Sequence, residues 1–419
     1  MAALFAALLG ARTVRDPGVR PDEAPIGQPL RGLTSSEMAY FSAGLTSFQE
    51  VEDVAQGLGP TFNLDSCAGC HAYPAVGGSS PFMNPQIAVA VKNGAVNRVP
   101  AFLKPDGPVR VVRFPFKPGT NTRDGGVHGL FSIAGRADAP GCAAAQTDFD
   151  RAAQAGNAIF RIPTPLFGAG LMEAIPDSTI VQNMNANTVQ KAGLRIGGHP
   201  NHNANDGTIT RFGWKAQNGS LLLFAAEAYN VEMGVSNELF PQERDAAAGC
   251  VFNAQPEDGV HLDRAGMTAA FSDIALFTAY MRYLDAPAPQ PETPSIARGR
   301  EVFQSVGCAL CHTPSLTTGT MASAALSGRV VTLYSDLLLH RMGGGLADNV
   351  VQGEAGPDEF RTAPLWGAGQ RIFFLHDGRT ADLLEAIRAH GGEAGAVVQA
   401  FMAQAPERQQ DLLSFVRSL

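Results

Sequence analysis

The stretches CAGCH (Cys67–His71) and CALCH (Cys308–His312) contain four of the six cysteines in this chain of 419 residues. The pattern Cys-x-x-Cys-His is the signature at which haem c is attached. Two thiols at this spacing reach the vinyl groups on one edge of a porphyrin, and the next residue places an imidazole beneath the iron. We therefore expect two covalently bound haem c groups, with thioether bonds from Cys67, Cys70, Cys308 and Cys311 and with His71 and His312 as proximal iron ligands.

Two other uses of a Cys-x-x-Cys pair fit this chain less well. A zinc site combines two such pairs, which usually lie within tens of residues of each other, whereas Cys70 and Cys308 are far apart. A redox disulfide would not need a histidine directly after both copies. The haem interpretation accounts for the complete pattern in both places.

The cysteines also bear on the compartment. Haem c is attached outside the cytoplasm, so we expect a periplasmic or exported protein. The remaining pair, Cys142 and Cys250, suits an oxidising compartment as a disulfide across a long loop, although two unrelated thiols are the alternative. The first residues, MAALFAALLGA, resemble the second half of a secretion signal but lack its positive n-region, so a frayed helix is equally compatible.

The composition is that of a compact soluble enzyme. Hydrophobic residues make up 45% of the chain and charged residues 17%, and no stretch approaches the length of a membrane-spanning helix. The formal net charge of -8 comes without a basic stripe, which argues against a nucleic-acid partner. An acidic surface would suit a small basic electron-carrier protein.

The chain divides at a proline-rich stretch. DAPAPQPETP (Asp285–Pro294) has neither helical nor strand periodicity and predicts a linker. We expect an N-terminal segment over residues 1–30. A cytochrome c-like domain with an insertion, carrying the first haem and the active site, should follow over 31–290. A C-terminal cytochrome c domain with the second haem should cover 295–419.

The two halves echo each other. PLFGAG (Pro165–Gly170) recurs as PLWGAG (Pro364–Gly369), each with an arginine shortly upstream, Arg161 and Arg361. Each copy follows a haem motif and leads into an aromatic turn and an apolar helical run. This pattern indicates the duplication of one haem-binding unit, with an insertion in the first copy.

The second helical run follows FFLHDGR. We expect it to begin after Thr380 as N-cap and to stop at Gly391 and Gly392. Leu383, Leu384, Ile387 and His390 then share one face. His390 would end this apolar stripe and point toward a core or a haem, although a histidine in the last turn also suits the helix dipole.

These motifs together resemble the di-haem cytochrome c peroxidases. The segments GPTFNLDSCAGCH, LFGAGLMEAIPD, RFGWKA, YSDLLLHRMGG, FRTAPLWGAG and FLHDGRT are similar to the branch described as di-haem oxidoreductases, peroxidase-like or thiol oxidoreductase-like. The resemblance runs from about Gly59 to the C-terminus. It implies a mainly α protein of two cytochrome c-like haem domains, with the active site at their interface.

The resemblance also implies a set of site residues. In the peroxidases, the distal ligand of the second haem lies fourteen residues beyond the histidine of the His-Asp-Gly motif, which here leads from His376 to His390. Trp214 aligns with His376, and the matching position in the first half is Ala228, which cannot bind iron. The first haem would therefore be open to peroxide, and the second would have two histidine ligands.

Two residues take catalytic roles by the same resemblance. Glu232 falls where the family places an acid/base glutamate above the open haem, where a carboxyl can move a proton between the peroxide oxygens. Trp214 matches the tryptophan that relays electrons between the haems. Without the resemblance, a surface glutamate and a core tryptophan would be the ordinary interpretations.

The chain departs from the peroxidases in two respects. They usually have methionine where His390 stands, and histidine should lower the potential of the second haem. They also bind calcium through a Thr and a Pro at the positions of Arg371 and Phe373, so a calcium site is not supported here. Among the other histidines, His128 is the best candidate for a switchable distal group on the first haem, and His340 would meet a haem propionate or simply pack.

The sequence thus predicts a periplasmic di-haem c-type oxidoreductase of peroxidase type, whose substrate is a small oxidant such as peroxide. Two alternatives remain: an electron-transfer cytochrome with both haems six-coordinate, and an oxidase that acts on a partner protein or a thiol.

Overall fold

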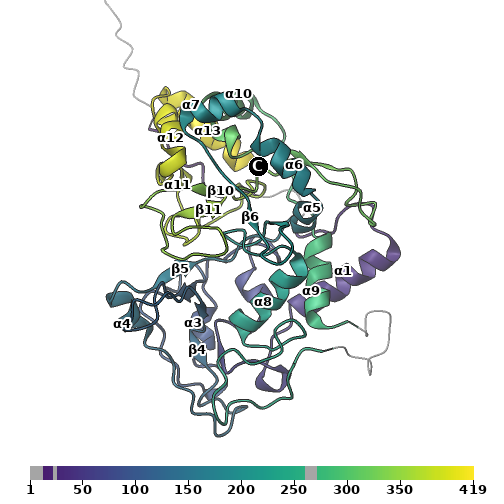
Figure 1. Ribbon diagram of the computed structural model, residues 1–419, viewed down its shortest axis with the longest axis vertical. Helices are drawn as coiled ribbons and strands as arrows, with labels where there is room; N and C mark the ends of the chain where they lie inside the picture. Colours follow the sequence, from purple (N-terminus) through teal and green to yellow (C-terminus); the bar gives the residue numbers. More distant parts are fainter. Residues whose placement is uncertain (1–12, 22–25, 260–270) are drawn as a thin grey trace, which may run out of the picture.

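The computed structural model describes residues 13–21, 26–259 and 271–419, so residues 1–12 of the predicted signal-like segment lie outside it. Helices dominate the regular structure of these residues, and long loops connect them (Figure 1). The expectation of a mainly helical chain is confirmed. The α-helices are α1 Ser35–Phe48, α2 Cys67–Cys70, α3 Gln86–Val89, α4 Phe149–Gln154, α5 Ala169–Glu173, α6 Asp177–Met184, α7 Thr188–Leu194, α8 Leu221–Met233, α9 Asp273–Tyr283, α10 Pro294–Ser305, α11 Leu383–Arg388, α12 Gly395–Met402 and α13 Pro406–Ser418.

Short antiparallel strands and 3₁₀ turns fix the loops. The strand pairs are β1 Thr61–Phe62 with β4 Phe131–Ser132, β6 Asn201–His202 with β7 Ile209–Thr210, β8 Leu316–Thr317 with β9 Val330–Val331, and β10 Leu339–Arg341 with β11 Glu359–Arg361. β2 Val111–Arg113 lies between β3 Val127–His128 and β5 Ile159–Arg161. The 3₁₀ turns are η1 Val54–Gln56, η2 Lys92–Gly94, η3 Cys308–Leu310 and η4 Gly392–Ala394.

Two helix pairs frame the molecule. The helix that precedes each Cys-x-x-Cys-His motif packs on a later helix, α1 on α9 and α10 on α13. Each contact depends on a glycine, because a Cβ atom on Gly44 would collide with the carbonyl oxygen of Leu276, and one on Gly299 with that of Asp411. Glycine therefore allows both helix pairs to approach closely. The same device in both halves agrees with the duplication.

The two pairs contribute to separate apolar cores. One core surrounds α1, α8 and α9, and the other is built from α10 to α13, which lie together at the top of Figure 1. Some segments cross between them: Ile196 joins the C-terminal core, and Asp16 pairs with Arg417 at 2.5 Å. The proposed division after residue 290 remains a prediction.

The linker and the remaining cysteines behave as expected. Asp285 to Glu292 form no helix or strand; Thr293 then caps α10 through a hydrogen bond from the N–H of Ile296, with Pro294 in the first turn. Cys142 and Cys250 form a disulfide across 108 residues. Among the described residues, no helix has the length and apolar character that a bilayer crossing requires.

Candidate functional site

A cavity in the C-terminal half contains the CALCH motif. Its walls include Cys308, Cys311 and His312, and His390 also lines it. The other lining side chains are largely aliphatic or aromatic, among them Phe303, Leu365, Phe374, Leu383, Ile387, Val397, Phe401, Leu412 and Val416. Such apolar walls suit the faces of a porphyrin. The two motif cysteines are free thiols, so they are available for thioether bonds.

Two of the four histidines that line this cavity, His312 and His390, each have Nδ1 next to a backbone carbonyl. The Nδ1 atom of His312 lies 3.0 Å from the carbonyl oxygen of Tyr334, and that of His390 lies 2.7 Å from the carbonyl oxygen of Ala386. A carbonyl only accepts hydrogen bonds, so each Nδ1 carries the proton and each Nε2 is left as a free donor to a metal. Burial lowers the pKa of His312 to about 4 and also lowers the pKa of His390. Both rings are therefore neutral at pH 7.

The histidine of the CAGCH motif in the N-terminal half is oriented in the same way as His312. The Nδ1 atom of His71 donates to the carbonyl oxygen of Gly78 at 3.0 Å, and burial lowers the pKa of His71 to about 4. Phe48 of α1 packs against the imidazole with ring centroids 6.0 Å apart. Cys67 and Cys70 are free thiols, and burial raises the pKa of both. The donor sets of both halves fit covalently attached haem.

The local structure around His390 differs in detail from the sequence expectation. Asp382, not Thr380, caps α11, because its side chain accepts from the N–H of Glu385. Thr380 instead accepts from the N–H of Asp382. The helix already ends at Arg388, so His390 lies just beyond it. Its contact with Ala386, one turn back, fixes the imidazole.

The two repeats are linked by reciprocal hydrogen bonds. The N–H of Arg361 donates to the carbonyl oxygen of Trp214 at 2.9 Å, and the N–H of Ile162 donates to that of His376 at 2.8 Å. Arg361 and Ile162 each stand three residues before the proline of their repeat. Ile162 therefore makes the hydrogen bond that is equivalent to that of Arg361, and Arg161 stands one residue before it.

The same symmetry supports the comparison of Ala228 with His390. Both α8 and α11 begin seven residues after the equivalent pair Trp214 and His376. Position fourteen after Trp214 is Ala228, inside α8, and position fourteen after His376 is His390, beyond α11. A methyl group therefore stands in the first repeat where the second has an imidazole.

Glu232 lies near the end of α8, where its side chain is half-buried beside the buried Asn63. Its Oε2 atom accepts a hydrogen bond from the side-chain amide of Asn63 at 2.9 Å. Burial raises the pKa of Glu232 to about 7, and the guanidiniums of Arg113 and Arg244 oppose this shift. The next residue, Met233, places its sulfur 3.8 Å from the Sγ atom of Cys67. Glu232 is thus a carboxyl with a pKa near neutral, one residue before the contact that Met233 makes with the first Cys-x-x-Cys-His motif.

A buried ion-pair network holds the segment that carries Trp214. Asp348 contacts Arg161 at 2.6 Å and Lys215 at 3.1 Å, and all three side chains are buried. Trp214 itself donates from Nε1 to the carbonyl oxygen of Ile162 at 2.9 Å. The indole is therefore fixed between the repeats, and it lines the C-terminal cavity.

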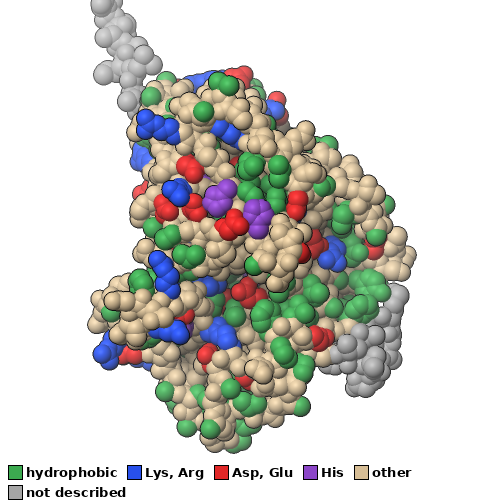
Figure 2. All heavy atoms as spheres, in the orientation of Figure 1, with side chains coloured by type: hydrophobic (Ala, Val, Ile, Leu, Met, Phe, Trp, Pro, Cys, Tyr) green, Lys and Arg blue, Asp and Glu red, His purple; other side chains and the backbone are tan. Residues whose placement is uncertain are grey.

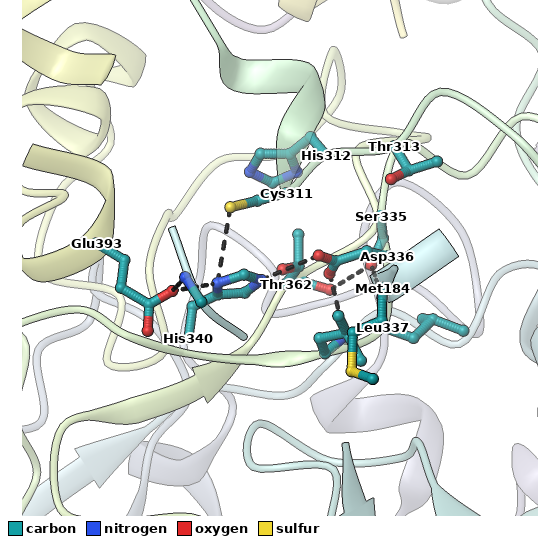
Figure 3. Close-up of polar contacts among 12 residues, drawn as sticks. Met184, Cys311, His312, Thr313, Ser335, Asp336, Leu337, His340, Thr362 and Glu393 are labelled. Atoms are coloured by element: carbon teal, nitrogen blue, oxygen red, sulfur yellow. Dashed lines mark hydrogen bonds and ion pairs between the residues drawn. The ribbon is translucent and has the colours of Figure 1, made fainter. Parts of the chain in front are cut away.

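His340 has no ring nitrogen left for a propionate. Its Nε2 atom lies 2.9 Å from Asp336 and its Nδ1 atom 2.8 Å from Glu393, as Figure 3 shows. Burial disfavours the charged ring, but the two carboxylates outweigh it and hold the pKa of His340 well above its usual range. His340 is an imidazolium beside Cys311, whose Sγ atom is 3.7 Å away.

His128 is also engaged within the protein. Its Nε2 atom contacts Asp124 at 3.1 Å, and its ring stacks on Phe114 with centroids 4.1 Å apart. Its role as a switchable ligand remains a prediction.

Sequence reasoning missed Asn63 and Arg113 as neighbours of Glu232, because no local pattern connects them. It noted Arg371 only as a departure from a calcium ligand, although the guanidinium of this half-buried arginine lies over Trp214.

Comparison with known families bears directly on this arrangement. The family described as "Di-haem oxidoreductase, putative peroxidase" matches residues 141–419, which include CALCH, Trp214, Glu232 and His390. The chain belongs to this family. The match begins after CAGCH, so the first motif of this di-haem oxidoreductase rests on its own pattern and on the geometry of His71. No curated protein shows significant sequence similarity to the chain.

Several solved structures are similar to this di-haem oxidoreductase. The diheme peroxidase BthA from Burkholderia thailandensis is 14% identical, with 97% of this chain and 92% of that chain covered and a TM-score of 0.41. A MauG-like protein associated with microbial copper homeostasis is 17% identical over 53% of this chain and 77% of its own, with a TM-score of 0.29. Hydrazine synthase from Kuenenia stuttgartiensis is 18% identical over 35% of this chain and only 55% of its own, with a TM-score of 0.24.

Proposed function

We propose that this chain is a periplasmic or exported c-type di-haem oxidoreductase that reduces peroxide. Cys67 and Cys70 would attach one haem and Cys308 and Cys311 the other, with His71 and His312 as proximal ligands. Haem supplies an iron that exchanges single electrons and binds oxygen ligands. The disulfide between Cys142 and Cys250 supports an oxidising compartment.

The difference between Ala228 and His390 carries the proposal. His390 presents a free Nε2 to the C-terminal cavity, whereas the equivalent methyl group of Ala228 cannot bind iron. The N-terminal haem site would thus keep one coordination position for substrate. The C-terminal site, closed by two histidines, would serve electron transfer.

Glu232 would move the proton. With a pKa of about 7, it is deprotonated often enough at neutral pH to accept a proton from bound hydrogen peroxide and to return it to the departing oxygen. Reduction of one hydrogen peroxide to two water molecules consumes two protons and two electrons. The electrons would come from a reduced carrier protein and pass by Trp214.

The carrier protein would meet a surface of mixed charge. Figure 2 shows acidic and basic side chains mixed on one face of the molecule.

The proposal is tested on the ferric holoprotein. Electron paramagnetic resonance should show one high-spin and one low-spin haem, and hydrogen peroxide should react at the high-spin site. Two low-spin haems without a peroxide reaction would instead establish an electron-transfer cytochrome. Turnover with a thiol or a partner protein, but none with peroxide, would favour the oxidase alternative.

The role of Glu232 is tested by its pH profile. In the wild type, the rate of the peroxide reaction should rise as the pH passes about 7, and Glu232→Gln should be slow and flat with pH. Glu52→Gln is the matched control, because the pKa of Glu52 is likewise raised, to about 8, but its carboxylate accepts a hydrogen bond from the hydroxyl of Tyr229 at 2.9 Å. A Glu232→Gln variant with the wild-type profile would remove the assigned role.

A further inference from the structure

Two arginines, Arg361 buried and Arg371 half-buried, stand where the halves of the molecule meet. Arg361 and Arg371 line the C-terminal cavity, and they also line a smaller cavity bounded by Thr164, Pro165 and Leu166 of the first repeat. The residues common to both cavities, here called the shared wall, are Trp214, Arg361, Ala363, Pro364 and Arg371. The shared wall therefore lies between the two repeats.

Arg371 lacks hydrogen-bond partners for two of its guanidinium nitrogens in this position. Its guanidinium lies over the indole of Trp214, 5.6 Å from the ring centroid. Its Nε and Nη2 atoms are buried without a hydrogen-bond partner. Burial alone lowers the pKa of Arg371 to about 10, so the group is still a cation at pH 7. Arg361 is partly satisfied, because its Nε and Nη1 atoms donate to the carbonyl oxygens of Gly213 and Thr362, each at 3.1 Å.

Several other buried arginines among the described residues contact carboxylates. Arg161 contacts Asp348 at 2.6 Å, and Arg417 contacts Asp16 at 2.5 Å. Among the described residues, no carboxylate is bonded to Arg371 or Arg361. A buried charge without a partner is strongly unfavourable, and two adjacent ones are more so. An anion bound at the shared wall would neutralise these charges, and the described residues do not supply one.

We propose that Arg371 and Arg361 form a carboxylate-binding site in the shared wall, which receives propionate groups of haem. This inference rests on the proposed haem content. The propionates of a haem attached through Cys308 and Cys311 would lie at the edge opposite its thioether bonds, and both arginines line the cavity that would hold this haem. The planar guanidinium matches a carboxylate through two parallel hydrogen bonds, which suits the vacant Nε and Nη2 of Arg371.

The site would have a consequence for electron transfer. The cation over the Trp214 ring is drawn to the negative face of the indole and disfavours removing an electron from it. Carboxylates bound to Arg371 would offset this effect and fix the guanidinium. Arg371 is thus a positioning residue for the haem edge and for Trp214, not a group that reacts.

The test compares Arg371→Met, Arg371→Lys and Arg388→Gln in the holoprotein with both haems attached. Arg388, exposed at the end of α11, is the matched control. Spectroelectrochemistry should show a lower midpoint potential of the C-terminal haem in Arg371→Met, because a positive charge that favours the reduced state is lost. Arg371→Lys should recover most of the shift, and Arg388→Gln should match the wild type.

Thermal unfolding gives an independent result. If propionates occupy the site, Arg371→Met leaves them buried without a cation, and the holoprotein should unfold at a lower temperature. An unchanged potential together with a higher unfolding temperature would overturn the proposal, because this result is expected when a buried charge without a partner is removed. Neither measurement uses peroxide, so a failure of the peroxidase function and a failure of this site are distinguishable.

Discussion

The indole of Trp214 and the imidazole of His376 meet edge to face, with ring centroids 6.4 Å apart. These residues occupy equivalent positions in the two repeats, so the duplication brings its own symmetric pair into contact. The imidazole of His376 stacks on the ring of Phe360, with centroids 4.3 Å apart. The Nζ atom of Lys215 lies 4.2 Å from the centroid of the Phe360 ring. A short column of rings therefore crosses the boundary between the halves.

Replacing Trp214 by phenylalanine should weaken the ring contacts between the repeats but keep an aromatic side chain at this position. The variant loses the hydrogen bond to Ile162, which should cost about 1 kcal/mol of stability. Electron transfer between the haems should slow about tenfold, equivalent to about 1.4 kcal/mol in the activation barrier. Stopped-flow reduction of the two haems measures this rate.

Trp366→Phe is the control for this change, because Trp366 is the only other tryptophan of the sequence and is likewise buried. It should lose stability but keep the internal electron-transfer rate. If both variants slow the rate equally, general loosening of the core and not the position of Trp214 explains the effect.

His390→Met should change the reduction potential of the C-terminal haem but not that of the N-terminal haem. Methionine opposite histidine raises the reduction potential of a haem relative to two histidines. We therefore expect a higher midpoint potential for the low-spin haem and the appearance of a methionine-to-iron absorption band. His202→Ala, on the partly exposed hairpin of β6 and β7, should alter neither property. An unaltered low-spin spectrum in His390→Met would show that His390 is not a ligand.

The raised pKa of Glu232 predicts a pH dependence of stability. Between its usual pKa near 4.5 and the folded value of about 7, the folded protein holds a proton that the unfolded chain has released. The free energy of unfolding therefore falls as the pH rises through this window. Glu232→Gln should remove this loss and gain roughly 1–3 kcal/mol over the wild type at pH 8, but little at pH 4.

Urea unfolding of the holoprotein at both pH values measures this difference. Glu238→Gln serves as the control, because Glu238 is exposed in the loop that follows α8 and should show no pH-dependent gain. A gain for Glu232→Gln of equal size at both pH values would contradict the assignment of the titration to this carboxyl.

The disulfide between Cys142 and Cys250 should contribute strongly to stability. It closes a segment of 108 residues, and its removal should cost about 2–4 kcal/mol because the unfolded chain gains freedom. The double variant Cys142→Ser, Cys250→Ser should therefore unfold at a lower temperature. Reductant should destabilise the wild type to the same extent and leave the double variant unaffected, since thioether bonds to haem are not reduced by thiols.

Much of the site was accessible to sequence reasoning because its signals are local. The spacing within CAGCH and CALCH identifies the haem attachment points, and the repeated Pro-Leu-aromatic-Gly-Ala-Gly segment indicates the duplication. The resemblance to the di-haem peroxidases then leads from His376 to His390. The motif spacing and the repeated segment can be recognised within a few residues of sequence.

The tertiary structure decided what depends on contacts between distant segments. Only folding places Asn63 on Glu232, sets the pKa of that carboxyl, and shows that Asp336 and Glu393 occupy both nitrogens of His340. It also brings Arg371 over Trp214 without a carboxylate among the described residues. Burial and charge partners arise from residues up to hundreds of positions apart, so no local pattern encodes them. The sequence by itself predicts which groups bind haem, and the fold decided their protonation and their partners.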